Sequence, residues 1–248
     1  MNSTNLQSFV EYANLKGVPL RVAFKSETWW MKLIAFFLKP VNPKFLTDYI
    51  TTIGSTIYYP SPGYVHDNAD SAFRVACHEF VHAWDSIQKG GFWFSFSYLF
   101  PQILFVLAPF GFLAFVWKWF ALLFLFALAL IPWPAPWRTK AEQRGYAMTM
   151  YVDYWTSGAL PIESDTHRRE FFEDQFLGWF YYRMQWSQAA FVRWYGLTIA
   201  SMIVVCPLWI QRGSDPPVGP DAPYGLVYEF FNTRGLLSLA FKAKARTL

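Results

Sequence analysis

Charged residues are scarce in this 248-residue chain, of which they make up only 15%. An ordinary soluble domain carries about 25%, whereas here 54% of the residues are hydrophobic and 21% are aromatic. This composition excludes an intrinsically disordered protein, because the apolar content is ample to offset the entropy lost on ordering. The length allows one large domain or two small ones. The scarcity of charge also indicates a second low-polarity environment besides a core, namely a lipid membrane or a large hydrophobic protein partner.

Cysteine and clustered positive charge are scarce as well. Cys77 and Cys206 lack the spacing of a disulfide framework, a thiolate metal site or a CxxC redox pair, and are predicted to be small buried side chains. The net charge is +4 and the basic residues are scattered, so nucleic acid is not indicated as a partner. Residues 1–17 contain Glu11 and no basic region ahead of an apolar run, so no signal peptide is expected.

The N-terminal part, residues 1–91, changes from strand-like to helical patterning. Residues 18–24 and 49–59 alternate in the manner of β-strands, and a short helix at 29–38, too brief to cross a bilayer, is expected between them. Apolar residues then recur at helical spacing over 72–88, after a polar Asn-Ala-Asp-Ser start and before a Gly-Gly stop. This order predicts a small sheet followed by an amphipathic helix.

Residues 92–137 form an almost uncharged segment in which Lys118 is the single charge. Its two uncharged runs each reach the roughly 18 residues at which a membrane-spanning helix becomes the default interpretation. The Ala-Pro-Phe-Gly sequence at 108–111 predicts a tight reversal, and hence a helical hairpin with legs near 92–107 and 112–131. The alternative is a hairpin fully buried within a soluble assembly.

Tryptophan and basic residues flank this segment in the manner of a membrane-interface anchor. Trp133, Trp137, Arg138 and Lys140 follow it, and Lys89 precedes it. Positive charge at both ends would place both ends on the cytoplasmic side of a membrane. The sequence therefore predicts a membrane-associated protein.

The rest of the chain is predicted to be a helical part at 138–210, followed by a Pro-rich loop and a basic tail at 211–248. One helix is expected over 140–155, and a long aromatic helix over about 167–195. A third apolar run, 197–210, is interrupted by a proline and is only marginally long enough to span, so its membrane status stays open.

The HEFVH sequence at 78–82 contains the residues best suited to chemistry. On a helix, residues four apart share a face, so His78 and His82 can offer two imidazole nitrogens to one metal ion. Glu79 lies beside them, within reach of a metal-bound water without being a ligand itself. This is the arrangement of a hydrolytic zinc site. The alternative is two ordinary helix histidines beside a surface glutamate.

This motif resembles that of the zincin metallopeptidases, and the order of elements over 18–155 is similar to theirs. The resemblance implies an α+β fold, with a small sheet, a motif helix and an edge strand, here 51–59, that lies antiparallel to bound peptide. The metzincin branch is excluded, because Asp85 and Gln88 stand where it has a glycine and a third histidine.

The gluzincin branch takes its third ligand from a glutamate on a later helix, and Glu142 is the best match. Membrane zincins with hydrophobic spans between the motif and this glutamate have the most similar architecture, although Tyr146 stands where their downstream motif has an aspartate. A hairpin returns the chain to the side it left, so Glu142 can meet the two histidines, whereas a single crossing would separate them. The other candidates for the third ligand are Asp153, Glu163, Asp165 and His167.

The resemblance also implies roles around the metal. Glu79 would be the general base, and the candidates for a donor to the oxyanion are Tyr146 and His167. Asp85 could orient a ligand imidazole, or could equally be a solvated helix carboxylate. His66 is expected to be a plain surface residue.

The predicted function is that of a membrane-associated zinc metallopeptidase that hydrolyses peptide or protein substrates, with Zn²⁺ held by His78, His82 and Glu142. The alternative is a structural or assembly protein, of a virion or a secretion machine for example. Such a protein would insert the hairpin into a membrane or a partner and would carry an inactive zincin-like domain.

Overall fold

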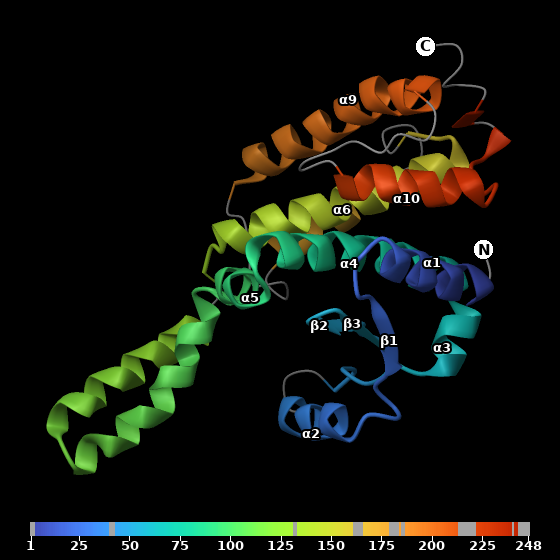
Figure 1. Cartoon of the computed structure of the whole chain (residues 1–248). Coiled ribbons are helices and arrows are strands. Elements are labelled where there is room, and N and C mark those ends of the chain that lie inside the picture. Colours follow the sequence, from blue (N-terminus) through green and yellow to red (C-terminus); the bar gives the residue numbers. More distant parts are fainter. Residues whose placement is uncertain are drawn as a thin grey trace.

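A computed structural model gives an α+β fold that is mostly helical and contains one small sheet (Figure 1). The structure describes residues 3–39, 43–130, 133–160, 166–178, 184, 187–212, 222–239 and 241–242. In chain order the elements are α1 (Ser3–Leu15), β1 (Arg21–Phe24), α2 (Trp29–Leu38), β2 (Thr51–Ile53), β3 (Thr56–Tyr59), α3 (Pro62–Asp67), α4 (Ala69–Lys89), α5 (Gly91–Leu99), the 3₁₀ helices η1 (Gln102–Phe115) and η2 (Lys118–Leu130), α6 (Pro136–Ser157), α8 (Thr166–Leu177), α9 (Gln188–Arg212) and α10 (Ala222–Thr233).

The sheet has the strand order β1-β3-β2, with β3 parallel to β1 and antiparallel to β2. The sequence predicts one strand over 49–59, but Gly54-Ser55 turns the chain and makes a hairpin of β2 and β3. The edge strand predicted at 51–59 is therefore only the three residues of β2. The central strand β3 is tied to α4, because the Tyr59 hydroxyl donates a hydrogen bond to the Ala72 carbonyl at 2.7 Å.

Helix α4 lies at the centre of the fold, packed against α6, with the sheet on one side and α9 and α10 on the other (Figure 1). Its apolar residues recur every three or four positions, as the sequence predicts, and they form the core with α1 and α10. The ring of Phe9 on α1 lies 5.5 Å from Phe73, 5.6 Å from Phe80 and 5.2 Å from Phe230 between ring centroids. This aromatic cluster fixes α4, and with it the HEFVH motif.

The long helix predicted over 167–195 is wrong, because the chain forms two helices there, α8 and α9. Helix α8 ends before Gly178, and α9 begins after Ser187, whose hydroxyl accepts a hydrogen bond from the Ala190 amide at 3.2 Å as a cap does. Helix α9 continues through the apolar run at 197–210. Over Gln188–Cys206 it is long and apolar enough to cross a membrane, and 33% of that stretch is buried against the protein.

The C-terminal part departs from the predicted loop and tail at 211–248. Residues 222–233 form the helix α10, in which Phe230 and Phe231 are buried in the core. A proline at the second position is compatible with the first turn of a helix, so the proline-rich composition does not prevent this helix. The basic tail at 243–248 lies outside the described residues.

The apolar segment forms a helical hairpin, made of η1 and η2, that projects from the body of the protein (Figure 1). Helix α5 meets η1 at an angle of 80° at Phe100-Pro101, where proline prevents continuation of the helix. The predicted reversal at 108–111 is wrong, since the chain turns at residues 116–117. Gly111 lies within η1 instead, where a Cβ atom would be 2.8 Å from the Phe124 ring of η2. Glycine is therefore needed there for the close approach of the two legs.

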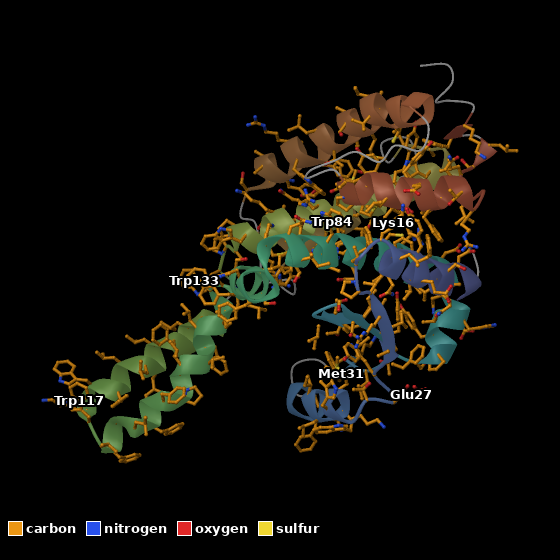
Figure 2. All side chains as sticks on the ribbon, in the orientation of Figure 1. Lys16, Glu27, Met31, Trp84, Trp117 and Trp133 are labelled. Carbon is orange, nitrogen blue, oxygen red and sulfur yellow. The ribbon has the colours of Figure 1, made fainter. Side chains whose placement is uncertain are left out.

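The surface of the hairpin is apolar on all sides. Its single charge, Lys118, lies at the end of the hairpin between Trp117 and Trp119, while Trp133 lies at the base (Figure 2). The large exposed apolar side chains are Phe105, Val106, Leu107, Phe110, Phe112, Leu113, Phe115, Val116, Trp117, Trp119, Leu122, Phe124, Leu125 and Leu128. An exposed apolar surface of this extent is typical of a membrane or protein contact.

Candidate metal centre

The two motif histidines project from α4 toward α6 and lie buried beside a glutamate of that helix. His78, His82 and Glu142 each offer one ligand atom, and the three atoms all lie within 4.8 Å of one another. The Nε2 atoms of the two histidines are 3.0 Å apart. Glu142 Oε2 lies 3.4 Å from His78 Nε2, and Glu142 Oε1 lies 3.8 Å from His82 Nε2.

These separations fit a shared ion. A tetrahedral zinc site with metal–ligand bonds of about 2.0–2.1 Å has neighbouring ligand atoms about 3.3–3.4 Å apart. The two histidine nitrogens are 3.0 Å apart, and each lies 3.4–3.8 Å from a different oxygen of the Glu142 carboxylate, so one carboxylate oxygen would have to move closer to one of the nitrogens. The group could therefore hold a metal ion with small adjustments of the side chains.

The charges within the cluster favour a ligating carboxylate. Burial opposes the charged form of Glu142, but the two imidazoles hold the pKa of its carboxyl well below the usual range. Burial would likewise lower the pKa of His82, but Glu142, with smaller contributions from Glu79 and Asp85, holds that pKa above its ordinary value. An ionised carboxylate thus lies next to two imidazoles. A metal cation bound there would be attracted by the charge of the carboxylate.

Gly145 permits the close contact between α6 and His78. A Cβ atom at this position would lie 2.5 Å from His78 Nε2 and 2.6 Å from its Cε1. The contact distance of carbon and nitrogen atoms is well above 3 Å, so any larger residue would collide with the imidazole. Sequence reasoning missed this role. The available signal was a glycine one turn after Glu142 inside a helix, where glycine is otherwise unfavourable.

Tyr98 on α5 is a further residue of the site that sequence reasoning missed. Its hydroxyl donates a hydrogen bond to Glu142 Oε1, and the Arg138 guanidinium lies over its ring, 5.2 Å from the centroid. The sequence predicts that the apolar segment is a leg of the hairpin, which gives no reason to place one of its residues at the site. The signal was a hydroxyl group in a segment with few polar atoms.

Tyr98→Phe should weaken metal binding about 10- to 100-fold, because hydrogen bonds to a ligand from outside the coordination sphere typically contribute that much. The measurement is titration of the metal-free protein with Zn²⁺ in competition with a chelator. Tyr12→Phe is the matched control, since it removes a core hydroxyl that donates to the Leu226 carbonyl and not to the cluster. Equal affinities in the two variants would contradict a role for Tyr98.

The two predicted donors for the oxyanion differ in what the structure describes. The Tyr146 ring packs against His78, with centroids 4.7 Å apart, while its hydroxyl donates to Gln175 Oε1 at 2.9 Å. In the structure the hydroxyl of Tyr146 is thus bonded to Gln175 and its ring contacts His78, while a role as a donor to the oxyanion stays a prediction. His167 lies on α8, and its side chain falls outside the described part of the chain.

The alternative third ligands do not join the cluster where they are described. Asp153 is buried and accepts a hydrogen bond from Arg74 at 2.9 Å. Glu163 and Asp165 lie outside the described residues. Within the described ranges, His78, His82 and Glu142 are the one such group of potential metal ligands.

Asp85 is predicted either to orient a ligand imidazole or to be a solvated helix carboxylate, but it is buried and pairs with basic residues instead. Its carboxylate lies 3.0 Å from Arg144 and 3.7 Å from Lys89. His82 Nδ1 is buried and has no hydrogen-bond partner among the described residues. His66 is an exposed residue beside Asp67, as predicted, and both cysteines are free and buried, as predicted.

Glu79 follows His78 on α4 and is half-buried. Its charge contributes to the raised pKa of His82, as expected for a carboxylate close to the cluster.

No protein-family model matches the chain, and no curated protein or solved structure is significantly similar to it. The site itself is therefore the basis for assigning a function.

Proposed function

We propose that the protein is a membrane-associated, zinc-dependent metallopeptidase of zincin-like fold. The observation that carries the proposal is the convergence of His78, His82 and Glu142, with Glu79 at the adjoining position of the same helix. Two histidines and a carboxylate are the ligands of catalytic zinc in several peptidases, and three protein ligands leave a coordination position open. The resemblance of the HEFVH motif to that of the zincins supports the same proposal.

The residues of the cluster and its neighbours have distinct roles in the proposed reaction. His78, His82 and Glu142 would hold a zinc ion, which would act as a Lewis acid toward a carbonyl group and would activate water. Glu79 would accept the proton of the attacking water and return it to the leaving amine. Tyr98 would hold the Glu142 carboxylate in place by its hydrogen bond.

The test combines metal content with hydrolysis. Purified protein should contain about one equivalent of zinc, which His78→Ala should lose, because only three protein ligands are present. Glu79→Gln should keep the zinc and lose at least about 100-fold in the rate of peptide hydrolysis, since it removes only the general base. A mixture of quenched fluorescent peptides serves as the substrate. Glu11→Gln, at an exposed position of α1, is the matched control.

Two outcomes would contradict the proposal. One is wild-type protein that binds no zinc at micromolar concentration. The other is Glu79→Gln protein that hydrolyses peptides as fast as the wild type.

The projecting apolar hairpin favours a second candidate function, that of a structural or assembly protein that inserts the hairpin into a membrane or a partner. In that case the metal cluster would only stabilise the fold. Biological activity would then depend on the hairpin and would be unaffected in Glu79→Gln, whereas the peptidase proposal requires its loss.

A further inference from the structure

Helix α2 presents an apolar face to the outside of the protein. Trp29 is 74% exposed, Leu33 is 49% exposed and Phe36 is 72% exposed. These positions are four and three residues apart, so their side chains lie along one face of the helix. A stripe of this kind on a helix of ten residues is unusual for a surface in contact with water.

The opposite face of α2 fixes the orientation of this stripe. Met31 is fully buried, and the Trp30 ring packs edge-on against Tyr58 of β3 with centroids 5.0 Å apart. Before the helix, the Thr28 hydroxyl donates to the Phe24 carbonyl at 2.8 Å. The helix is therefore held against the sheet by one face, and the apolar stripe is directed outward.

Two lysines lie beside the apolar stripe. Lys32 and Lys39 are both exposed, and helical geometry places both on the same side of the stripe. No acidic residue occurs between Trp29 and Lys39. Apolar side chains flanked by lysines, with tryptophan among them, are the pattern of a helix that lies in the plane of a membrane surface and contacts anionic headgroups.

The position of α2 relative to the hairpin agrees with a shared membrane. Figure 1 shows both on one side of α4 and α6, with α9 and α10 on the other side. In Figure 2, Met31 marks α2, and Trp117 and Trp133 mark the two ends of the hairpin. A bilayer that receives the hairpin would thus extend on the side where α2 lies.

The size of the stripe argues against a second copy of the chain as its occupant. Three large side chains bury on the order of 500 Å² in total. A stable protein–protein interface buries about 800 Å² on each partner. A lipid surface needs no such minimum, because it acts together with the hairpin.

We propose that α2 is an interfacial membrane-binding helix, whose Trp29, Leu33 and Phe36 side chains enter the boundary between headgroups and acyl chains of the leaflet that receives the hairpin. Lys32 and Lys39 contact anionic headgroups there. This inference rests on the membrane association in the proposed function, but not on zinc or on hydrolysis.

The test uses single cysteines carrying the environment-sensitive fluorophore NBD on the full chain in anionic phosphatidylglycerol-containing vesicles. Cys77 and Cys206 are buried and do not interfere with labelling. Leu33→Cys should show NBD emission that rises several-fold and is quenched about twofold more by nitroxides near the headgroups than by nitroxides deep in the acyl region. Leu125→Cys on η2 should show the reverse order, and Leu15→Cys, exposed on α1, should show no quenching.

Charge reversal gives an independent measure. Lys32→Glu and Lys39→Glu should each weaken binding to anionic vesicles at least about fivefold, because each lysine near such a surface contributes about 1 kcal/mol. The same substitutions should leave binding to neutral vesicles and zinc content unchanged.

Three results would overturn the inference. Quenching at Leu125→Cys without quenching at Leu33→Cys would leave hairpin insertion intact and remove only the role of α2. NBD emission per molecule of Leu33→Cys protein that rises with protein concentration in the absence of lipid would identify a second copy as the occupant. Absence of quenching at both positions would remove membrane association altogether, whereas zinc content and hydrolysis test the peptidase separately.

Discussion

Replacing Gly145 with alanine should reduce zinc affinity by at least about 100-fold, although the residue itself offers no ligand. The added methyl group would lie 2.5 Å from His78 Nε2, so the imidazole must leave its position beside Glu142. Alanine favours a helix by about 1 kcal/mol over glycine, so α6 itself is not weakened. The measurement is zinc titration in competition with a chelator, with circular dichroism to verify the helix content.

Gly196→Ala is the matched control for this experiment. This glycine also lies inside a helix, α9, but a Cβ atom there would meet nothing within 4 Å. It should bind zinc as the wild type does. Wild-type affinity in Gly145→Ala would show that His78 is not required where the structure has it, and would contradict the proposed metal centre.

Leu125→Arg should reduce partitioning into vesicles about 100-fold. The position is exposed near the middle of η2, and an arginine at the centre of a bilayer costs about 3 kcal/mol. The legs η1 and η2 have 14 and 13 residues. At about 2.0 Å per residue in a 3₁₀ helix, they are about 28 and 26 Å long, close to the roughly 30 Å of the hydrocarbon core. Flotation of the protein with vesicles of neutral lipid measures the effect.

Phe115→Arg is the control for the effect of depth. Phe115 is exposed next to the turn at residues 116–117, and an arginine at the far membrane surface costs only about 0–1 kcal/mol. Its partitioning should stay within about fivefold of the wild type. Equal losses in Leu125→Arg and Phe115→Arg would contradict insertion into a bilayer and would indicate a protein partner. Zinc content should be unchanged in both variants, which verifies that the body of the protein is folded.

Local patterns in the sequence predict those parts of the structure that depend on local interactions. The helix around HEFVH is confirmed as α4, because periodic apolar residues and a Gly-Gly stop specify it without help from the rest of the chain. Proximity of Glu142 to the histidines could also be expected, because the resemblance proposes it and a hairpin permits it. The coarse α+β composition is likewise confirmed.

The presence of a glycine does not by itself predict the local structure, because glycine occurs both in turns and at close contacts between helices. Gly111 predicts a turn, but in the structure it is needed for contact with Phe124 on the other leg. Gly54 divides a run of strand-forming residues that otherwise looks continuous, so the predicted strand over 49–59 is two strands. A local pattern cannot distinguish a glycine that turns the chain from one that admits a neighbour.

Contacts between distant segments account for the rest. Tyr98 reaches Glu142 only because α5 packs on both α4 and α6, and Gly145 faces His78 only because α4 and α6 lie side by side. The position of Asp85 on the motif helix suggests that it could orient a ligand histidine, but Arg144 from α6 forms an ion pair with it. Such partners are determined by tertiary packing, which the spacing of one motif does not encode.

The hydrogen bond between Tyr98 and Glu142 has a thermodynamic consequence, because it joins α5, at the base of the hairpin, to a residue of the proposed metal centre. Coupling free energies are reciprocal, so whatever docking of α5 adds to zinc affinity, bound zinc adds to the docking of α5. In the proposed metal centre, loss of the ion would therefore weaken the docking of α5, and with it the hold on the base of the hairpin. Displacement of α5 would in turn weaken the binding of the ion by the same free energy.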